Sequence, residues 1–199
     1  MRHGQYNLKS GELTDLGREQ ARLTGIRLRE MADKGMEDHY GKIAVSWDGF
    51  AFSDVARAKE TAKIITTQLQ SVEANCDPML AEGWPCIPKP YNGEIAPNDQ
   101  VLAESSRIEG AFSKYIHRAE KIDEKEQPDE LHTFTLIVCH QNVIRYFVTR
   151  ALQIPPEYWL RFRGDNCGIT EIIIYDNGKV SLGKFADVGH LSPRQPTFH

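Results

Sequence analysis

The segment Thr133-Phe-Thr-Leu-Ile-Val-Cys139 is the most strand-like stretch of the chain, and His140 follows it directly. It is apolar almost throughout, which is typical of a strand buried on both faces at the centre of a parallel sheet. Val143, Phe147 and Ala151 then recur every four positions, which predicts a helix immediately after the strand. A buried strand that leads straight into a helix indicates an α/β fold.

The rest of the chain alternates between helical and strand-like patterns in the same way. Thr14 can cap a helix that runs to about Met31. Ser53 or Asp54 can cap a second helix, whose apolar residues repeat at helical spacing. Asn-Gly between two strand-like runs is a strong hairpin signal. The predicted elements are helices near 14–31, 58–69 and 108–119, a buried strand at 42–46, and a hairpin formed by 169–175 and 180–185.

The composition of the chain argues against several classes of protein. A length of 199 residues suggests one domain, spanning 1–199, since domains average roughly 150 residues. The 24 basic and 28 acidic side chains sum to −4, which argues against a nucleic-acid-binding protein. No apolar stretch approaches the roughly 20 residues of a membrane span, so we expect a soluble, intracellular chain without a membrane segment. Four scattered cysteines indicate free thiols rather than disulfides or a zinc site.

A small set of side chains is suited to phosphate chemistry. In open α/β sheets, ligands bind beyond the carboxyl ends of strands and against helix N-termini. His140 lies at such a strand end, and Arg57 lies near the start of its predicted helix, where the helix dipole favours an anion. Arg2 and His3 stand at the start of the chain, and Glu82 opens a proline-rich loop. Two histidines, two arginines and a carboxylate could together transfer a phosphoryl group without a metal.

Each of these residues also has an ordinary structural interpretation. Arg57 could belong to a solvated helix face, His140 could be a satisfied loop histidine, and Glu82 could be simply an acid in a loop. A catalytic pair of Cys139 and His140 is disfavoured, because adjacent strand residues point to opposite faces. The order of the motifs along the chain therefore carries more weight than any single residue.

In this order, the motifs resemble the histidine phosphatase superfamily over nearly the whole chain. The resemblance implies a three-layer α/β/α fold with a mostly parallel central sheet, like that of phosphoglycerate mutase. It also implies that the histidine of Arg-His-Gly accepts the phosphoryl group. The segments that carry it are Arg2-His3-Gly4, Leu13-Thr14-x-x-Gly17-x-x-Gln20-Ala21, Ser53-x-x-x-Arg57-Ala58-x-Glu60-Thr61-Ala62, Glu82-Gly83 and Cys139-His140.

Further segments are similar to a mitochondrial branch of phosphoglycerate mutase-like proteins that act as serine/threonine protein phosphatases. This resemblance implies phosphorylated proteins as substrates, a mitochondrial location, no cofactor, and a homo-oligomer, most simply a dimer. The segments include Arg107-Ile108-Glu109, Tyr115-Ile116-His117-Arg118-Ala119, Asn142-Val143-Ile144-Arg145-Tyr146 and Pro155-Pro156-Glu157.

The role expected of each residue follows from the charge of a phosphomonoester, about −2 at neutral pH. Arg2 and Arg57 can hold the phosphate oxygens with fork-shaped donors, and His140 can add a hydrogen bond, best when protonated. His3 would attack through one neutral ring nitrogen, while a backbone carbonyl near Gly4 would fix the proton on the other. Glu82 would protonate the leaving alkoxide and then activate water, which needs a raised pKa. No metal is expected.

Two other functions fit the same motifs. One is a small-molecule phosphatase or mutase on this fold, which phosphoglycerate turnover would reveal. The other is a catalytically weak adaptor that binds phosphorylated partners through Arg2, Arg57 and His140, which phosphate binding without turnover would reveal.

The chain departs from the family pattern in two places. Only Met1 precedes Arg2, so we expect the family's buried first strand to be missing and its neighbours to lose a partner. Trp47–Phe52, between the predicted strand at 42–46 and the Arg57 helix, looks longer than in the family, which could displace Arg57 or add a substrate-facing loop.

Overall fold

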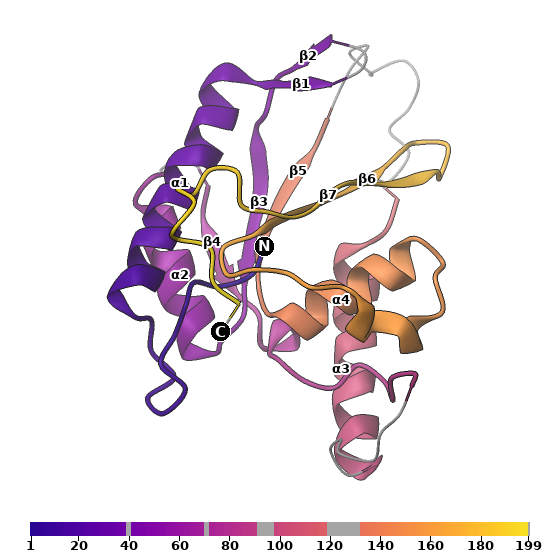
Figure 1. Cartoon of the computed structure of the whole chain (residues 1–199). Helices are drawn as coiled ribbons and strands as arrows, with labels where there is room; N and C mark the ends of the chain where they lie inside the picture. Colours follow the sequence, from indigo (N-terminus) through magenta and orange to yellow (C-terminus); the bar gives the residue numbers. More distant parts are fainter. Residues whose placement is uncertain (39–40, 70–71, 91–97, 119–131, 199) are drawn as a thin grey trace.

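The computed structural model describes residues 1–38, 41–69, 72–90, 98–118 and 132–198 (Figure 1). Helices and strands alternate through most of the chain, and Thr14 caps the first helix as predicted, by accepting a hydrogen bond of 3.0 Å from Gly17 N. The elements are α1 Asp15–Lys34, β1 Met36–Asp38, β2 Gly41–Ile43, β3 Trp47–Phe52, α2 Ala56–Thr66, β4 Ala74–Cys76, the 3₁₀ helix η1 Pro78–Leu80, α3 Asn98–Tyr115, β5 Phe134–Val138, α4 Gln141–Ala151, the 3₁₀ helix η2 Pro156–Arg161, β6 Ile169–Ile174 and β7 Val180–Asp187.

A parallel sheet lies at the centre of the molecule, with its strands in the order β4-β3-β5 (Figure 1). β5 is the strand predicted from the apolar run 133–139, and α4 follows it directly, as predicted. β3 pairs with β5 on one side, where Phe52 lies opposite Val138, and with β4 on the other. Because the three strands run in the same direction, their carboxyl ends meet at one edge of the sheet, where α/β proteins bind their ligands.

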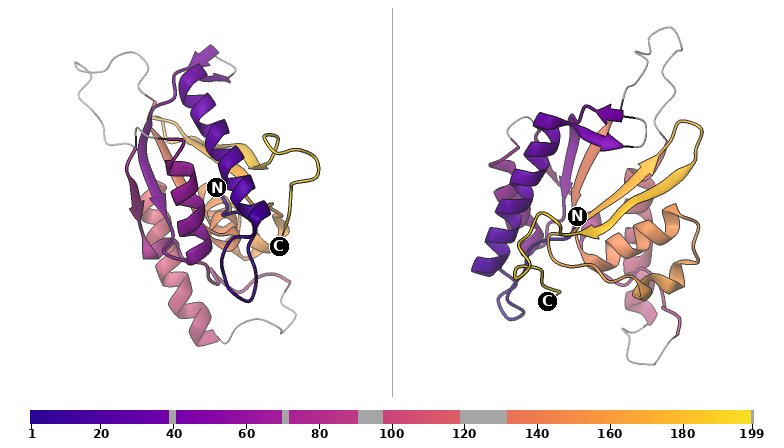
Figure 2. Two further views of the ribbon diagram at one scale, coloured as in Figure 1. Left: turned by 90° about the vertical axis from the view of Figure 1, so that its left-hand side faces the viewer. Right: turned by 45° about the horizontal axis from the view of Figure 1, so that its top comes forward.

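Different helices cover the two faces of this sheet. Phe50, Leu136 and Val138 pack into a core with α1 and α2, whereas Ala51 and Cys139 pack into a core with α3 and α4. Neighbouring strand residues point to opposite faces, so β3 and β5 each contribute to both cores. Figure 1 and Figure 2 show the same division of the helices between the two sides. The predicted three-layer α/β/α arrangement is confirmed.

The predicted hairpin is confirmed as β6 and β7, which pair antiparallel in a sheet of their own. Its turn is closed by a hydrogen bond of 2.9 Å from Tyr175 N to Lys179 O. Gly178 has a φ of +83° in this turn, a left-handed conformation that glycine adopts without strain.

The predictions for 42–46 and for Trp47–Phe52 are wrong. Gly41–Ile43 forms a short antiparallel pair with β1, outside the central sheet. The segment expected to displace Arg57 or to add a substrate-facing loop is instead β3, the middle strand of the sheet, in which Phe50 and Ala51 are buried against the two helical layers. Asp48 and Gly49 weaken the strand pattern in the sequence, but burial between two layers outweighs local preference.

Met1–His3 lies beside the carboxyl end of β5. Arg2 forms a parallel bridge with Cys139, and His3 N donates to Cys139 O at 3.1 Å. On its other side, Arg2 N donates to Gly168 O and Cys167 N donates to His3 O, each at 3.2 Å. These first residues therefore connect the edge of the central sheet to the segment that leads into β6. No other described strand connects the central sheet to the β6-β7 sheet.

The backbone that follows His3 packs directly against α1 and α2. A Cβ atom added to Gly17 would lie 1.9 Å from Gln5 O, and one added to Gly4 would lie 2.5 Å from Gly17 O. Gly4 N also donates to Thr61 Oγ1 of α2, at 3.0 Å. Backbone contact this close requires glycine on both sides, so the two glycines determine where the chain leaves His3.

We expect Gly17→Ala to lower the free energy of unfolding by about 1–3 kcal/mol, because the added methyl group would force the backbone at Gln5 away from α1. Denaturant unfolding measures the change. Gly49→Ala is the matched control, since its Cβ would meet Thr135 Cγ2 at 3.5 Å, an ordinary van der Waals contact. A Gly17→Ala protein as stable as the control would contradict this packing.

Candidate active site

His3 is buried, with 1% of its surface exposed, and both of its ring nitrogens have partners. Nδ1 lies 2.8 Å from the carbonyl oxygen of Gly4, so Nδ1 carries the proton and donates it, in agreement with the expected tautomer. Nε2 keeps its lone pair and accepts a hydrogen bond of 3.0 Å from Arg57 Nε. The nitrogen that could act as a nucleophile therefore faces a guanidinium group.

Two arginines lie beside His3. Arg57 stands in the first turn of α2, and its guanidinium carbon lies 4.5 Å from the ring centre of Tyr6. Arg2 is buried and donates from Nη1 to Gly164 O at 2.7 Å. The buried Nε of Arg2 has no hydrogen-bond partner among the described residues. Because buried donors are seldom left unpaired, this N–H is suited to bind an anion.

His140 follows β5 and is the N-cap residue of α4. It is buried, and its ring centre lies 5.1 Å from that of His3. Nε2 shares a hydrogen bond of 2.8 Å with Ser53 Oγ, whereas the buried Nδ1 has no partner in the part of the chain that the structure describes. The prediction that Ser53 or Asp54 caps the next helix is wrong, because Val55 is the N-cap of α2 and the Ser53 hydroxyl contacts His140.

Burial keeps both histidines neutral. Desolvation lowers the pKa of His3 well below 6.5; the hydrogen bond to Gly4 opposes this, and the charges of Arg2 and Arg57 add to it. Burial likewise lowers the pKa of His140 well below 6.5, and His3 and the same arginines lower it further. His140, expected to work best when protonated, is thus neutral without an anion. A phosphate dianion would favour its protonated form.

Glu82 lies close to both arginines, on the segment that follows η1. Burial raises the pKa of its carboxyl above 4.5, although a hydrogen bond from Gly83 N and the charges of Arg57 and Arg2 act in the opposite direction. Oε1 accepts hydrogen bonds from Gly83 N at 3.2 Å and from Asn142 N at 3.3 Å. The carboxyl therefore keeps its proton to a higher pH than an exposed glutamate, which a general acid requires.

Two further residues of the site, Ser53 and Asn142, are missed by the sequence reasoning. Asn142 N binds Glu82 Oε1, and Asn142 Nδ2 donates to Gly83 O at 3.2 Å, so the first turn of α4 holds the carboxyl in place. Both residues stand inside the quoted motifs, just before or within the first turn of a helix. Their polar side chains at these helix starts are the signal that could have identified them.

The surroundings of Cys139 disfavour a reactive thiol beside His140. Cys139 packs into the core formed with α3 and α4, and burial raises the pKa of its thiol to about 11. The prediction that Cys139 does not act with His140 as a reactive pair agrees with this placement. The four cysteines are free thiols, as predicted.

Within the described ranges, no group of three or more histidine, cysteine or acidic side chains could hold a metal, and no helix is long and apolar enough to cross a membrane.

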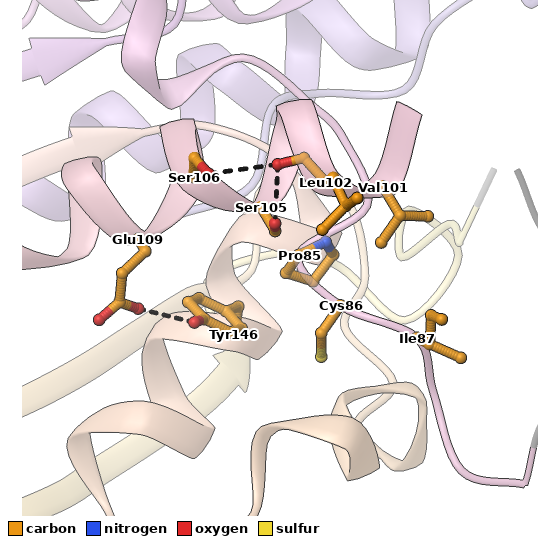
Figure 3. A pocket seen from close by; sticks show the side chains of 9 residues that line it. All are labelled: Pro85, Cys86, Ile87, Val101, Leu102, Ser105, Ser106, Glu109 and Tyr146. Carbon is orange, nitrogen blue, oxygen red and sulfur yellow. Dashed lines mark hydrogen bonds between the residues drawn. The ribbon is translucent and has the colours of Figure 1, made fainter. Parts of the chain in front are cut away.

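A cavity of about 720 Å³ lies between the loop after Glu82 and α3 (Figure 3). Apolar side chains such as Ile87 and Leu102 form much of its wall, and Tyr146 closes one end by donating a hydrogen bond of 2.6 Å to Glu109. None of the five predicted site residues lines this cavity. It is therefore separate from the cluster around His3.

We expect the stability of the protein to fall as the pH is lowered through 6.5, the ordinary pKa of histidine. The unfolded chain binds protons at His3 and His140 there, whereas the folded chain does not, so the slope should reach about 1.4 kcal/mol per pH unit for each histidine. Glu82 acts in the opposite direction, because its folded pKa is raised. The measurement is denaturant unfolding at several pH values in a Glu82→Gln background, where adding His3→Asn should reduce the slope. An unchanged slope would contradict a neutral buried His3.

The family model of the histidine phosphatase superfamily (branch 1) matches residues 1–187. The chain is 40% identical over 202 residues to the serine/threonine-protein phosphatase Pgam5, mitochondrial, of Caenorhabditis briggsae, and 41% identical over 203 residues to PGAM5 of Rattus norvegicus. These alignments cover 100% and 99% of this chain. They cover 65% and 64% of the two relatives, so the chain spans less than two thirds of their length.

Solved structures share the fold. Phosphoglycerate mutase from Plasmodium falciparum superposes with a TM-score of 0.63 and 32% identity, over 100% of this chain and 94% of that one. The alpha-ribazole phosphatase from Shigella flexneri superposes with a TM-score of 0.62 and 20% identity, over 94% of each chain, and at this identity it supports the fold alone. With the family model matched over 1–187 and the Arg-His-Gly segment paired to the end of the central sheet, the chain belongs to the histidine phosphatase superfamily, branch 1.

Proposed function

We propose that this chain, acting as one catalytic domain over 1–199, hydrolyses phosphoserine and phosphothreonine on proteins through a phosphohistidine formed on His3. The observation that carries the proposal is the state of His3: Nδ1 is tied to Gly4 O, and Nε2 keeps its lone pair beside Arg57. The names of the Caenorhabditis and rat relatives support protein substrates and a mitochondrial location. A homodimer remains a prediction from the resemblance.

The first step begins with the binding of a phosphate of charge about −2. Arg2 has an unpaired buried N–H, and Arg57 can exchange its contact with His3 for a phosphate oxygen. His140 can supply a further donor once the dianion raises its pKa. These groups stabilise the charge on the equatorial oxygens of the transition state.

The chemical step that follows is an in-line displacement at phosphorus. A bond forms between His3 Nε2 and phosphorus while the bond from phosphorus to the serine or threonine oxygen breaks. An alkoxide is a poor leaving group, so the proton of the Glu82 carboxyl passes to the departing oxygen. The products of this step are the free hydroxyl side chain, phosphohistidine and the Glu82 carboxylate.

In the second step, water is the nucleophile and Glu82 acts as the general base. The Glu82 carboxylate takes a proton from water as the water oxygen bonds to phosphorus, and the bond from phosphorus to His3 Nε2 breaks. Inorganic phosphate leaves and Glu82 is protonated again. The raised pKa of Glu82 suits both directions of proton transfer.

A mutase or phosphatase of small phosphoesters is the second candidate function, favoured by the 32% identity to phosphoglycerate mutase over the whole chain. A phosphoserine peptide and 3-phosphoglycerate, each assayed in EDTA, separate the two functions. Faster turnover of the peptide supports the protein phosphatase. Phosphate binding without turnover of either compound would favour the adaptor instead.

We expect His3→Asn to reduce peptide turnover by about 10⁴-fold or more, because asparagine offers no nucleophile. Brief incubation of the parent protein with ³²P-labelled peptide should leave acid-labile, base-stable label on the protein, and His3→Asn should leave none. Label that persists in His3→Asn would place the nucleophile elsewhere.

Glu82→Gln should slow a phosphoserine peptide by about 10²- to 10⁴-fold, the usual contribution of a general acid. p-Nitrophenyl phosphate should be affected far less, because its leaving group departs without a proton. Initial rates on the two substrates provide the comparison. Equal losses on both would remove Glu82 from the role of general acid.

A further inference from the structure

One face of α3 runs alongside the segment 77–84, which carries the proposed general acid. At the start of this segment, Asp77 Oδ2 accepts a hydrogen bond of 2.7 Å from Lys114 Nζ. At its end, Trp84 N donates to Glu104 Oε2 at 2.6 Å. Glu104 and Lys114 lie on the same side of the helix, since residues three and four apart share a face. The segment is thus fastened to α3 at both ends, in the antiparallel sense.

Arg107 stands between these two contacts on the same helix face. Its Nη1 donates to Met79 O at 2.8 Å and to Ala81 O at 2.7 Å, and its Nη2 donates to Glu82 O at 3.2 Å. A guanidinium can bind several acceptors at once because its donors are held in a rigid plane. The side chain of Arg107 therefore binds the main chain just before Glu82, at Met79 and Ala81, and at Glu82 itself.

The partners of Arg107 are backbone carbonyls rather than acids. Among the described residues, no carboxylate lies within ion-pair distance of its guanidinium. The contact with the following residue is also close, since a Cβ added to Gly83 would lie 2.8 Å from Arg107 Nη2. Arg107 therefore binds the backbone of this segment, through contacts that we call the Arg107 clamp, and does not form an ion pair on the surface.

The two ends of the Glu82 residue are held by different helices. Arg107 of α3 binds its carbonyl, and Asn142 of α4 binds its carboxyl oxygen. Arg107 is also close enough to the site for its charge to contribute to lowering the pKa of His140. If the backbone shifts, the carboxyl must shift with it, and a displacement near 1 Å can cost on the order of 100-fold in rate.

We propose that Arg107 is a positioning residue for Glu82, and that its clamp on the carbonyls of Met79, Ala81 and Glu82 sets the distance from the Glu82 carboxyl to the leaving oxygen. The inference rests on the proposed function, in which Glu82 protonates that oxygen. It predicts that loss of Arg107 reproduces the leaving-group dependence of a Glu82 variant without removing any group that touches substrate.

Arg107→Met should slow the phosphoserine peptide by about 100-fold and p-nitrophenyl phosphate by less than about 3-fold, as expected for a misplaced acid. Added to Glu82→Gln, it should cause no further loss on the peptide, because the two residues act as a unit. Lys114→Met is the matched control: it removes a cation from the same helix face and the same segment but leaves the Glu82 backbone clamped. It should not change the ratio of the two rates.

Equal losses on both substrates, or the same selective loss in Lys114→Met, would overturn the inference. If Glu82→Gln itself shows no selectivity, the proposed acid role fails; if Glu82→Gln is selective and Arg107→Met is not, the inference about Arg107 alone fails. Should Arg107→Met not fold, Arg107→Lys, with fewer donors for the carbonyls, should give an intermediate selective loss.

A second measurement does not depend on activity. The Glu82 carboxyl can be titrated by NMR in ¹³C-glutamate-labelled protein, with Glu82→Gln identifying its signal. Burial raises the pKa of Glu82, so release of its backbone in Arg107→Met should move that pKa toward 4.5. An unchanged Glu82 titration would show that Arg107 does not position the carboxyl.

Discussion

The pairing of Met1–His3 with Cys139 on one side and with Cys167 and Gly168 on the other is the interaction on which the rest of the site depends. The proposed in-line attack needs His3 held within about 1 Å, which backbone hydrogen bonds on both sides of its segment can provide. Here the bonds on both sides, together with the glycine contacts to α1, place His3 at the carboxyl edge of the central sheet. The other site residues are arranged around that fixed point.

Two arginines gathered beside two neutral histidines and one carboxyl group are the second property of the site. Arg2 and Arg57 lie beside two neutral histidines and a carboxyl whose burial favours its protonated form. Taking the Arg2 cation out of water costs free energy, and a phosphate dianion bound in the proposed site would offset that cost. In the proposed function, affinity for phosphate would thus be prepared during folding, which fits the general observation that functional sites are less stable than they could be.

The two sides of the proposed reaction, with His3 as nucleophile and Glu82 as acid, are supported by opposite layers of the fold. The nucleophile side is held by α1 and α2, through Gly17 and Thr61. The acid side is held by α3 and α4, through Arg107 and Asn142. The layers meet at the carboxyl edge of β3 and β5, so the packing of both helical cores on one sheet sets the distance between nucleophile and acid.

The strand at 133–139, the helix after it, the hairpin and the candidate site residues could be predicted from the sequence, because these depend on local periodicity and on short motifs. The place of this strand in the sheet could not: it lies beside β3, which is the middle strand. The sequence by itself did not determine β3, since Asp48 and Gly49 hide a strand that is chosen by burial between two layers. Nor did it determine the roles of Ser53, Asn142 and Arg107, which depend on contacts between residues far apart in the chain. Folding brings such groups within hydrogen-bond distance, because the packing of the layers, and not local preference, determines which donors meet which acceptors.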